Sequence, residues 1–293
     1  MRSVKREEIL KMSVGIVLEG GAMRGMFTAG VLDILMEHDI TFDGAVGVSA
    51  GAVFGCNLKS KQIGRAIRYN KRFAKDRRYC SLWSLLFTGD MFGAEFCYEK
   101  IPFHYDVFDL KTYRENPMPL YAVMTDVDTG KAVYKNLKEG SGIDMLYFRA
   151  SASMPIASRP VEVLGHRYLD GGMSDSIPLR FMQKKGYEKN VVVLTQPEGF
   201  VKEPARDMRV IAALLRKYPA MVKAMARRHI MYNKELELVK KCSLEGSAFV
   251  IQPPESLHIN HTEHDPNELQ RVYDIGRSTM EARLKELRSF ISA

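Results

Sequence analysis

Short apolar runs alternate with amphipathic stretches along the first two thirds of the chain. The runs at 14–18, 43–46, 120–124 and 191–195 are rich in aliphatic residues and have the length of buried strands. Between the first two runs, hydrophobic residues recur at helical spacing. The pattern predicts an α/β fold in which a mostly parallel central sheet carries helices on both faces.

The chain changes character at a Gly- and Pro-rich passage over 196–204. Beyond this passage the pattern is mainly helical, with one short apolar run at 249–251 and a long amphipathic final helix that begins at a capping aspartate. We therefore expect an α/β domain over 13–199 and a mainly helical C-terminal extension over 200–293 that packs on it. The sequence leaves open whether this extension also caps a substrate channel.

A serine lies at the centre of Gly47-Val48-Ser49-Ala50-Gly51, between a predicted strand and a predicted helix. In this setting a G-x-S-x-G motif places the serine on a sharp, strained turn, and the flanking glycines leave room for the backbone. The free N–H groups at the start of the helix favour negative charge on a nearby oxygen. The motif predicts that Ser49 is an exposed, rigid nucleophile, with Gly47 and Gly51 forming the elbow.

A second glycine cluster, Gly20-Gly21-Ala22-Met23-Arg24-Gly25, directly follows the first predicted strand. A dinucleotide loop would need glycine at position 22, and no Lys-Ser/Thr pair follows as in a P-loop, so phosphate binding is the second choice. Backbone N–H groups in such a loop are also suited to form an oxyanion hole. We expect Arg24 either to hold the loop by hydrogen bonds to its carbonyl groups or to be a solvated residue of the first helical turn.

A carboxylate follows a short strand in Asp170-Gly171-Gly172. The carboxyl ends of strands are where open α/β sheets place their chemistry, although Asp-Gly-Gly taken alone is more typical of an ordinary turn. The seven histidines have surface or turn contexts that give no specific indication of a catalytic role. Asp170 is therefore the better candidate for a general base.

These motifs, in this order, resemble the patatin-like phospholipase family, in its bacterial form with a helical C-terminal extension. The stretches at 125–130 and 150–155 resemble the same family, so the likeness covers residues from about 14 to about 200. It implies a patatin-like catalytic domain over 13–199 and a Ser-Asp dyad without histidine. Ser49 would attack a lipid acyl ester, Asp170 would be the base, and the loop from Gly20 to Gly25 would hold the oxyanion.

The chain departs from the family pattern at Ala22, where the family has the third residue of a triple glycine. A positive φ at this position would cost alanine about 1 kcal/mol relative to glycine. The dyad also requires Asp170 to be a stronger base than a solvated aspartate, whose pKa is about 3.9. Partial burial would raise that pKa.

Two other functions fit the same residues. The first is an α/β-hydrolase esterase with a Ser-Asp-His triad, in which Asp170 is joined by a later histidine such as His229 or His258. The second is a catalytically silent regulator that binds a lipid or a nucleotide through the two glycine turns. Neither acyl chain length, head group nor a preference for acyl transfer follows from the sequence.

The net charge of +8 raises anionic membranes and nucleic acids as partners. Nine basic residues lie between 59 and 78, and the apolar segment 82–87 follows them. Residues 59–87 could contact an anionic membrane, but we favour a solvated helix face followed by a buried cluster around Trp83. We expect no nucleic-acid partner, because no known binding module is present.

The histidines, cysteines and carboxylates lack the spacing of metal ligands, so we expect neither a metal ion nor another cofactor. The four scattered cysteines are typical of a reducing compartment. Residues 1–8 carry charges of both signs, and no apolar run has the length of a signal peptide or membrane span. These features predict a cytoplasmic protein, at most peripheral to a membrane.

Overall fold

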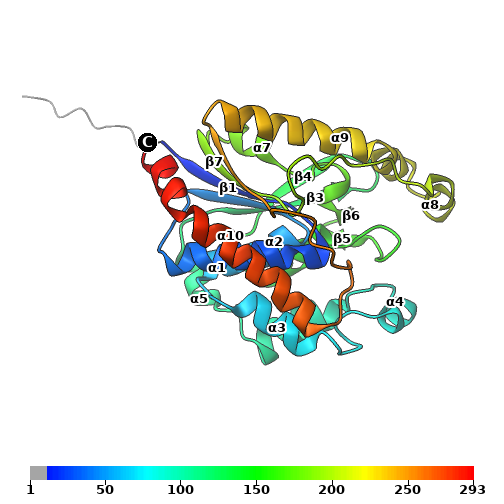
Figure 1. Ribbon diagram of the computed structural model, residues 1–293. Helices are drawn as coiled ribbons and strands as arrows, with labels where there is room; N and C mark the ends of the chain where they lie inside the picture. The colour runs from blue at the N-terminus through cyan, green and yellow to red at the C-terminus, as the bar shows by residue number, and fades with distance from the viewer. Residues whose placement is uncertain (1–11) are drawn as a thin grey trace, which may run out of the picture.

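The computed structural model describes residues 12–293, so the expectation drawn from residues 1–8 lies outside the described part (Figure 1). Within it, eight strands form one sheet in the order β5-β6-β3-β2-β1-β7-β8, and β4 pairs with β3 off this path. The strands are β1 (Val14–Leu18), β2 (Gly44–Val48), β3 (Leu120–Asp126), β4 (Ala132–Asn136), β5 (Val161–Val163), β6 (His166–Asp170), β7 (Lys189–Val193) and β8 (Ala248–Ile251).

The centre of the sheet is parallel, and one side of it is antiparallel. Strands β3, β2, β1, β7 and β8 run in the same direction, whereas β4 and β6 pair antiparallel with β3, and β5 pairs antiparallel with β6. Every residue of β1, β2 and β7 is buried, which explains why these strands read as continuous apolar runs. The prediction of a mostly parallel central sheet is confirmed.

Helices cover both faces of the sheet (Figure 1). One face carries α1 (Gly25–Glu37), α2 (Ala50–Ser60), α3 (Arg65–Phe73), α5 (Leu110–Glu115) and α10 (Pro266–Ser292), and the opposite face carries α7 (Leu179–Lys184) and α9 (Pro219–Leu244). The other helices are the short turns η1 (Ala22–Arg24) and η3 (Gly171–Met173), the π-helix η2 (Phe96–Tyr105), α4 (Leu82–Thr88), α6 (Ile143–Ser151) and α8 (Met208–Leu214).

The last helix packs tightly on the first. A Cβ atom on Gly30 would lie 2.1 Å from the carbonyl oxygen of Tyr273, and one on Gly276 would lie 2.0 Å from that of Phe27. Glycine at both positions therefore permits the close approach of α1 and α10. The Tyr273 hydroxyl also donates a 2.6 Å hydrogen bond to Asp33 in α1.

The C-terminal region contributes to both helical layers and to the sheet. Strand β8 extends the parallel part beside β7, α9 lies over one face, and α10 lies over the other (Figure 1). The boundary between 13–199 and 200–293 stays a prediction. Among residues 12–293, no helix has both the length and the apolar character needed to cross a membrane.

The interpretation of Trp83 as the centre of a buried cluster is wrong. Helix α4 projects from the body of the protein, and its large apolar side chains are 51–77% exposed, namely those of Leu82, Trp83, Leu86 and Phe87. Two of the basic residues before it are buried instead: Lys59 donates to the carbonyl groups of Asn116 and Met118, and Arg65 donates to that of Asp106. The exposed surface of residues 59–78 is therefore less basic than we expected. The segment 82–87 exposes more apolar surface than we expected.

Candidate active site

Ser49 lies on the turn between β2 and α2 with φ 54° and ψ −123°, a conformation that favours glycine. The flanking glycines are required by close packing. A Cβ atom on Gly47 would lie 2.5 Å from the backbone nitrogen of Ala52, and one on Gly51 would lie 2.4 Å from the carbonyl oxygen of Leu18. The segment thus has the strained strand–turn–helix geometry that its sequence predicted.

The expectation that Ser49 is exposed is wrong, since only 7% of the residue is accessible to solvent. The site opens into a cavity whose walls come from α3, η2 and α6 rather than directly into solvent. The backbone N–H of Ser49 donates to the Ser151 hydroxyl at 3.0 Å, and this hydroxyl donates to the carbonyl of Val123 at 2.7 Å. Ser151 lies in the stretch 150–155, but nothing in its sequence context indicated a contact with the elbow.

Strand register brings Asp170 to Ser49. Val48 at the end of β2 pairs with Val123 in β3, and Met124, the next residue of β3, pairs with Asp170 at the end of β6. The two candidate residues therefore flank the same part of β3. The Ser49 hydroxyl lies close enough to the Asp170 carboxylate to lower its pKa.

The Asp170 carboxyl group is fully buried, and burial raises its pKa above that of a solvated aspartate. The Ser49 hydroxyl, the charge of Arg228 and the hydrogen bond from the backbone of Gly172 oppose this rise. The Gly172 N–H donates to Asp170 Oδ1 at 2.8 Å. Asp170 thus carries a desolvated carboxylate that the Gly172 N–H holds in one orientation.

The glycines after Asp170 have different roles. A Cβ atom on Gly171 would lie 2.2 Å from the carbonyl oxygen of Val123, so this turn fits against β3 only without a side chain. Gly172 supplies the N–H for Asp170, and its own carbonyl accepts a 2.6 Å hydrogen bond from Arg228 Nε. Arg228 lies on α9, and no feature of its sequence context pointed to this site.

The first glycine cluster lies directly beside Ser49. A Cβ atom on Gly20 would lie 2.9 Å from that of Ser49, and one on Gly21 would lie 2.8 Å from Thr195 Oγ1. Ala22 has φ 48°, so an alanine occupies the left-handed region that the missing third glycine would favour. Gly25 lies against Phe54 and Ala50 of α2, which seats the start of α1 close to the elbow.

Arg24 does not hold this loop as we expected. Among the described residues its side-chain hydrogen bond joins Nη1 to Nε2 of His261 at 3.1 Å, rather than to a carbonyl of the loop. The reason is that the segment between β8 and α10, which contains His261, lies beside the loop. Arg24 and His261 are therefore in contact although 237 positions separate them in the sequence. The guanidinium therefore links the loop to the C-terminal region.

The hydrogen bonds of Ser49 and Asp170 within residues 12–293 involve no histidine. His229 lies on α9 with Nδ1 buried and without a hydrogen-bond partner there, and His258 lies in the segment between β8 and α10. In the same range, no group of three or more His, Cys, Asp or Glu side chains is arranged to hold a metal ion.

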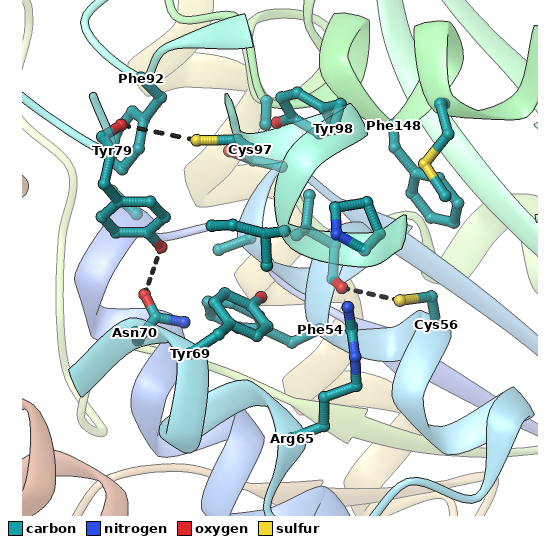
Figure 2. A pocket seen from close by; sticks show the side chains of 18 of the residues that line it. Phe54, Cys56, Arg65, Tyr69, Asn70, Tyr79, Phe92, Cys97, Tyr98 and Phe148 are labelled. Atoms are coloured by element: carbon teal, nitrogen blue, oxygen red, sulfur yellow. Dashed lines mark hydrogen bonds between the residues drawn. The ribbon is translucent and has the colours of Figure 1, made fainter. Parts of the chain in front are cut away.

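A largely apolar cavity extends from Ser49 between α2, α3, η2 and α6 (Figure 2). Aromatic rings surround it, and Cys56 and Cys97 face it as free thiols; burial raises the pKa of Cys56 to about 11. One wall has a fixed polar pair, since the Tyr79 hydroxyl donates to Asn70 at 2.5 Å. Apolar residues that line the cavity include Met23, Val53, Phe54, Phe92, Ile101, Phe108, Met145, Phe148 and Met154.

Comparison with known proteins gives two family matches. The model of the patatin-like phospholipase family matches residues 16–182, and a domain of unknown function, DUF6363, matches residues 218–292. The uncharacterized protein YjjU of Escherichia coli is 27% identical over 282 residues, which are 90% of this chain and 75% of that protein.

Lysophospholipase NTE1 of Debaryomyces hansenii is 30% identical over 188 residues, which are 62% of this chain but only 12% of that protein. Among solved structures, VipD from Legionella pneumophila aligns with a TM-score of 0.47 at 12% identity, over 94% of this chain and 67% of that one. The family model covers more than half of the chain and includes Ser49, Asp170 and both glycine turns. The chain therefore belongs to the patatin-like phospholipase family.

Proposed function

We propose that this protein hydrolyses acyl esters of lipids through a Ser49–Asp170 dyad. The observation that carries the proposal is that strand register brings the Ser49 hydroxyl beside the buried Asp170 carboxylate, whose pKa burial raises. Family membership supports a lipid substrate, and the name of the relative in Debaryomyces hansenii makes lysophospholipids the first class to test.

In the first half of the reaction, Ser49 Oγ attacks the ester carbonyl carbon while Asp170 accepts the hydroxyl proton. The carbonyl oxygen becomes an oxyanion beside the backbone N–H groups of the loop from Gly20 to Ala22 and the start of α2. The intermediate then expels the alcohol, which takes the proton from Asp170, and leaves an acyl-serine. Water attacks this ester with Asp170 again as base, which frees the fatty acid and restores Ser49.

Three features of the site lower the barrier in this scheme. Burial makes Asp170 a better proton acceptor than a solvated carboxylate. The loop donors contribute more, because one well-placed oxyanion donor is typically worth about 3 kcal/mol in the transition state. The strained elbow keeps Oγ in position, so little reorganisation accompanies the attack.

The cavity beside Ser49 is suited to the acyl chain. Its walls are mostly aliphatic and aromatic, and Ser49 is among the residues that line it. An acyl chain that enters it transfers apolar surface out of water, at about 0.8 kcal/mol for each buried CH₂ group. On the acyl side of the ester, the length of the acyl chain should therefore affect substrate binding more strongly than the size of the head group does.

The proposal is tested with a fluorophosphonate probe and a panel of lysophospholipids and p-nitrophenyl esters. Wild type should be labelled at Ser49 and should hydrolyse part of the panel. Ser49→Ala should lose both activities, and Asp170→Asn should lose hydrolysis while retaining its fold by circular dichroism. A silent regulator predicts no adduct that depends on Ser49. A histidine triad predicts that His229→Gln or His258→Gln abolishes turnover, whereas the dyad predicts near wild-type rates for both.

We also propose that α4 contacts the membrane that supplies the substrate. Its exposed Leu82, Trp83, Leu86 and Phe87 form a projecting apolar surface, and exposed arginines at 77 and 78 directly precede it. An apolar surface beside basic residues is typical of an interfacial contact with anionic lipid.

This contact is tested by flotation with vesicles that contain phosphatidylglycerol. Leu86→Glu and Phe87→Glu should each reduce the bound fraction several-fold. Leu244→Glu provides a matched control, because Leu244 is equally exposed but lies at the end of α9. Equal loss in all three variants would contradict a role specific to α4.

A further inference from the structure

Four basic side chains from distant parts of the chain converge beside the candidate dyad. Arg24 ends the glycine loop, Lys202 lies between β7 and α8, Arg228 lies on α9, and His261 lies between β8 and α10. The last two belong to the region that matches the domain of unknown function. We call these four residues the basic cluster.

Contacts of Arg24 and Arg228 place the cluster at the site. Arg24 Nη1 lies 3.1 Å from His261 Nε2, and Arg228 Nε donates to the carbonyl of Gly172 at 2.6 Å. A Cβ atom on Gly172 would lie 3.1 Å from Asp170 Oδ1 and 3.3 Å from Arg228 Nη2, so the guanidinium and the candidate base border the same small space. Lys202 Nζ lies 4.9 Å from the centre of the Tyr232 ring on α9.

The four groups affect one another electrostatically. Burial, followed by the charges of Arg228 and Arg24, lowers the pKa of Lys202 to about 8, and Glu19 partly opposes this shift. Burial, followed by Arg24, Arg228 and Lys202, lowers the pKa of His261. Such mutual repulsion is unfavourable unless an anion lies among the charges.

The acidic groups that face the cluster already have hydrogen-bond partners. Glu19 accepts from the Thr195 backbone and from the Tyr232 hydroxyl, both at 2.6 Å, and Asp170 accepts from the backbone of Gly172. Within residues 12–293 no member of the cluster forms a salt bridge, and Arg24 Nε is buried without a hydrogen-bond partner. The two arginines and the lysine of the cluster thus face the carboxylates of Glu19 and Asp170. This leaves net positive charge and free N–H donors at the site.

We infer that the basic cluster binds the phosphate group of a glycerophosphate acyl ester while the ester itself lies at Ser49. This inference rests on the proposed lipid hydrolase function and adds a preference for anionic head groups. Guanidinium groups bind phosphate through paired N–H donors, and an ammonium group adds a compact charge. Arg24 follows Ala22 of the oxyanion loop by two residues, so the basic cluster borders the loop beside which the ester carbonyl would lie. The C-terminal region would then supply the head-group side of the site, opposite the apolar cavity.

Lys202 is the most informative position to change. Arg24 and Arg228 lie against the oxyanion loop and the Asp170 turn, so their replacement would also affect chemistry. Lys202→Gln removes one charge and leaves a shorter, neutral polar side chain. Lys223→Gln on the exposed surface of α9 is the matched control, since it removes the same charge away from the cluster.

The kinetic test compares kcat/KM for 1-acyl lysophosphatidate with that for the monoacylglycerol of the same chain, which serves as a neutral reference within each variant. Wild type should prefer the phosphate ester. Lys202→Gln should lower the ratio about tenfold, as expected for the loss of one charged contact, whereas Lys223→Gln should leave it unchanged. A ratio that is the same in wild type and Lys202→Gln overturns the inference even when both substrates are hydrolysed.

A binding test separates this result from the failure of the hydrolase proposal. Glycerol 3-phosphate should raise the melting temperature of Ser49→Ala protein, which has no turnover, and glycerol should not. The double variant Ser49→Ala/Lys202→Gln should lose most of that shift. Stabilisation without hydrolysis by wild type would reject the catalytic proposal alone, and its absence would reject the phosphate site. Inorganic phosphate in a third arm shows whether the site needs the glycerol unit.

Discussion

The strained backbone at Ser49 predicts that two variants lacking the same hydroxyl differ in stability. Ser49→Ala and Ser49→Gly both remove the hydroxyl beside Asp170, and both retain the N–H that donates to Ser151. They differ in whether a Cβ atom is present at φ 54° and ψ −123°. Glycine occupies this conformation without steric cost, whereas alanine is strained there as serine is.

The expected size follows from two opposing terms. A non-glycine residue in such a region costs about 1–3 kcal/mol, which Ser49→Gly removes. Glycine also loses about 0.5–1 kcal/mol more conformational entropy than alanine on folding. Ser49→Gly should therefore exceed Ser49→Ala by about 1 kcal/mol in free energy of unfolding, or about 2–4 °C in melting temperature.

Urea denaturation followed by circular dichroism measures the difference, and Ser60 in the same helix provides the control. Ser60 is in the last turn of α2, so Ser60→Gly should be less stable than Ser60→Ala by about 1 kcal/mol, the opposite sign. If Ser49→Gly is no more stable than Ser49→Ala while the Ser60 pair behaves as expected, the elbow stores no strain and this explanation of its conformation is incorrect.

Four further predictions concern the site. Because burial raises the pKa of Asp170, the rate should fall on acidification at a pH above the titration range of a solvated aspartate, as read from kcat/KM against pH. Because the pKa of Asp170 is raised in the folded protein, the ionised form of this residue destabilises the folded state as pH rises through the raised pKa. Asp170→Asn should therefore unfold at a higher urea concentration than wild type at pH 7. The two proteins should not differ at a pH below the pKa that Asp170 has in the unfolded chain. Ala22→Gly should stabilise the protein by up to about 1 kcal/mol without loss of Ser49 labelling, since it relieves the steric strain of alanine at φ 48°. A large loss of labelling would show that the alanine sets the geometry of the loop. Val53→Phe should shift the preferred acyl chain to a shorter length in an ester panel, because Val53 lines the cavity one turn after Ser49.

The features that the sequence predicted well are local ones. The buried strands at 14–18 and 191–195 follow from apolar runs that need no knowledge of the rest of the chain. The elbow at Ser49 follows from glycine spacing, since the steric limits lie within the motif and its adjoining strand. The confirmed sheet and the observed turn geometry have the same origin in short-range constraints.

The features that were missed depend on long-range packing. Ser49 is buried because η2, a π-helix with Pro102 inside it, and α6 line the cavity above the elbow, and no periodicity identifies such walls. Asp170 reaches the site for a different reason from the one expected: β6 runs antiparallel to β3, so register rather than a common carboxyl edge brings it beside Ser49. Trp83 was assigned to a buried cluster because an apolar run alone does not show whether another segment covers it.

The C-terminal region and the oxyanion loop are structurally linked at Glu19. This residue directly precedes Gly20, and its buried carboxylate accepts hydrogen bonds from Thr195 after β7 and from Tyr232 on α9. Thr195 also donates to the carbonyl of Gly20 and fills the space beside Gly21. The loop that would hold the oxyanion is therefore fixed in part by α9, through a carboxylate that has no direct role in the proposed chemistry. Any change that displaces α9 should consequently alter the geometry of the loop before it alters the Ser49 elbow, whose own contacts run to β1, β3 and α6.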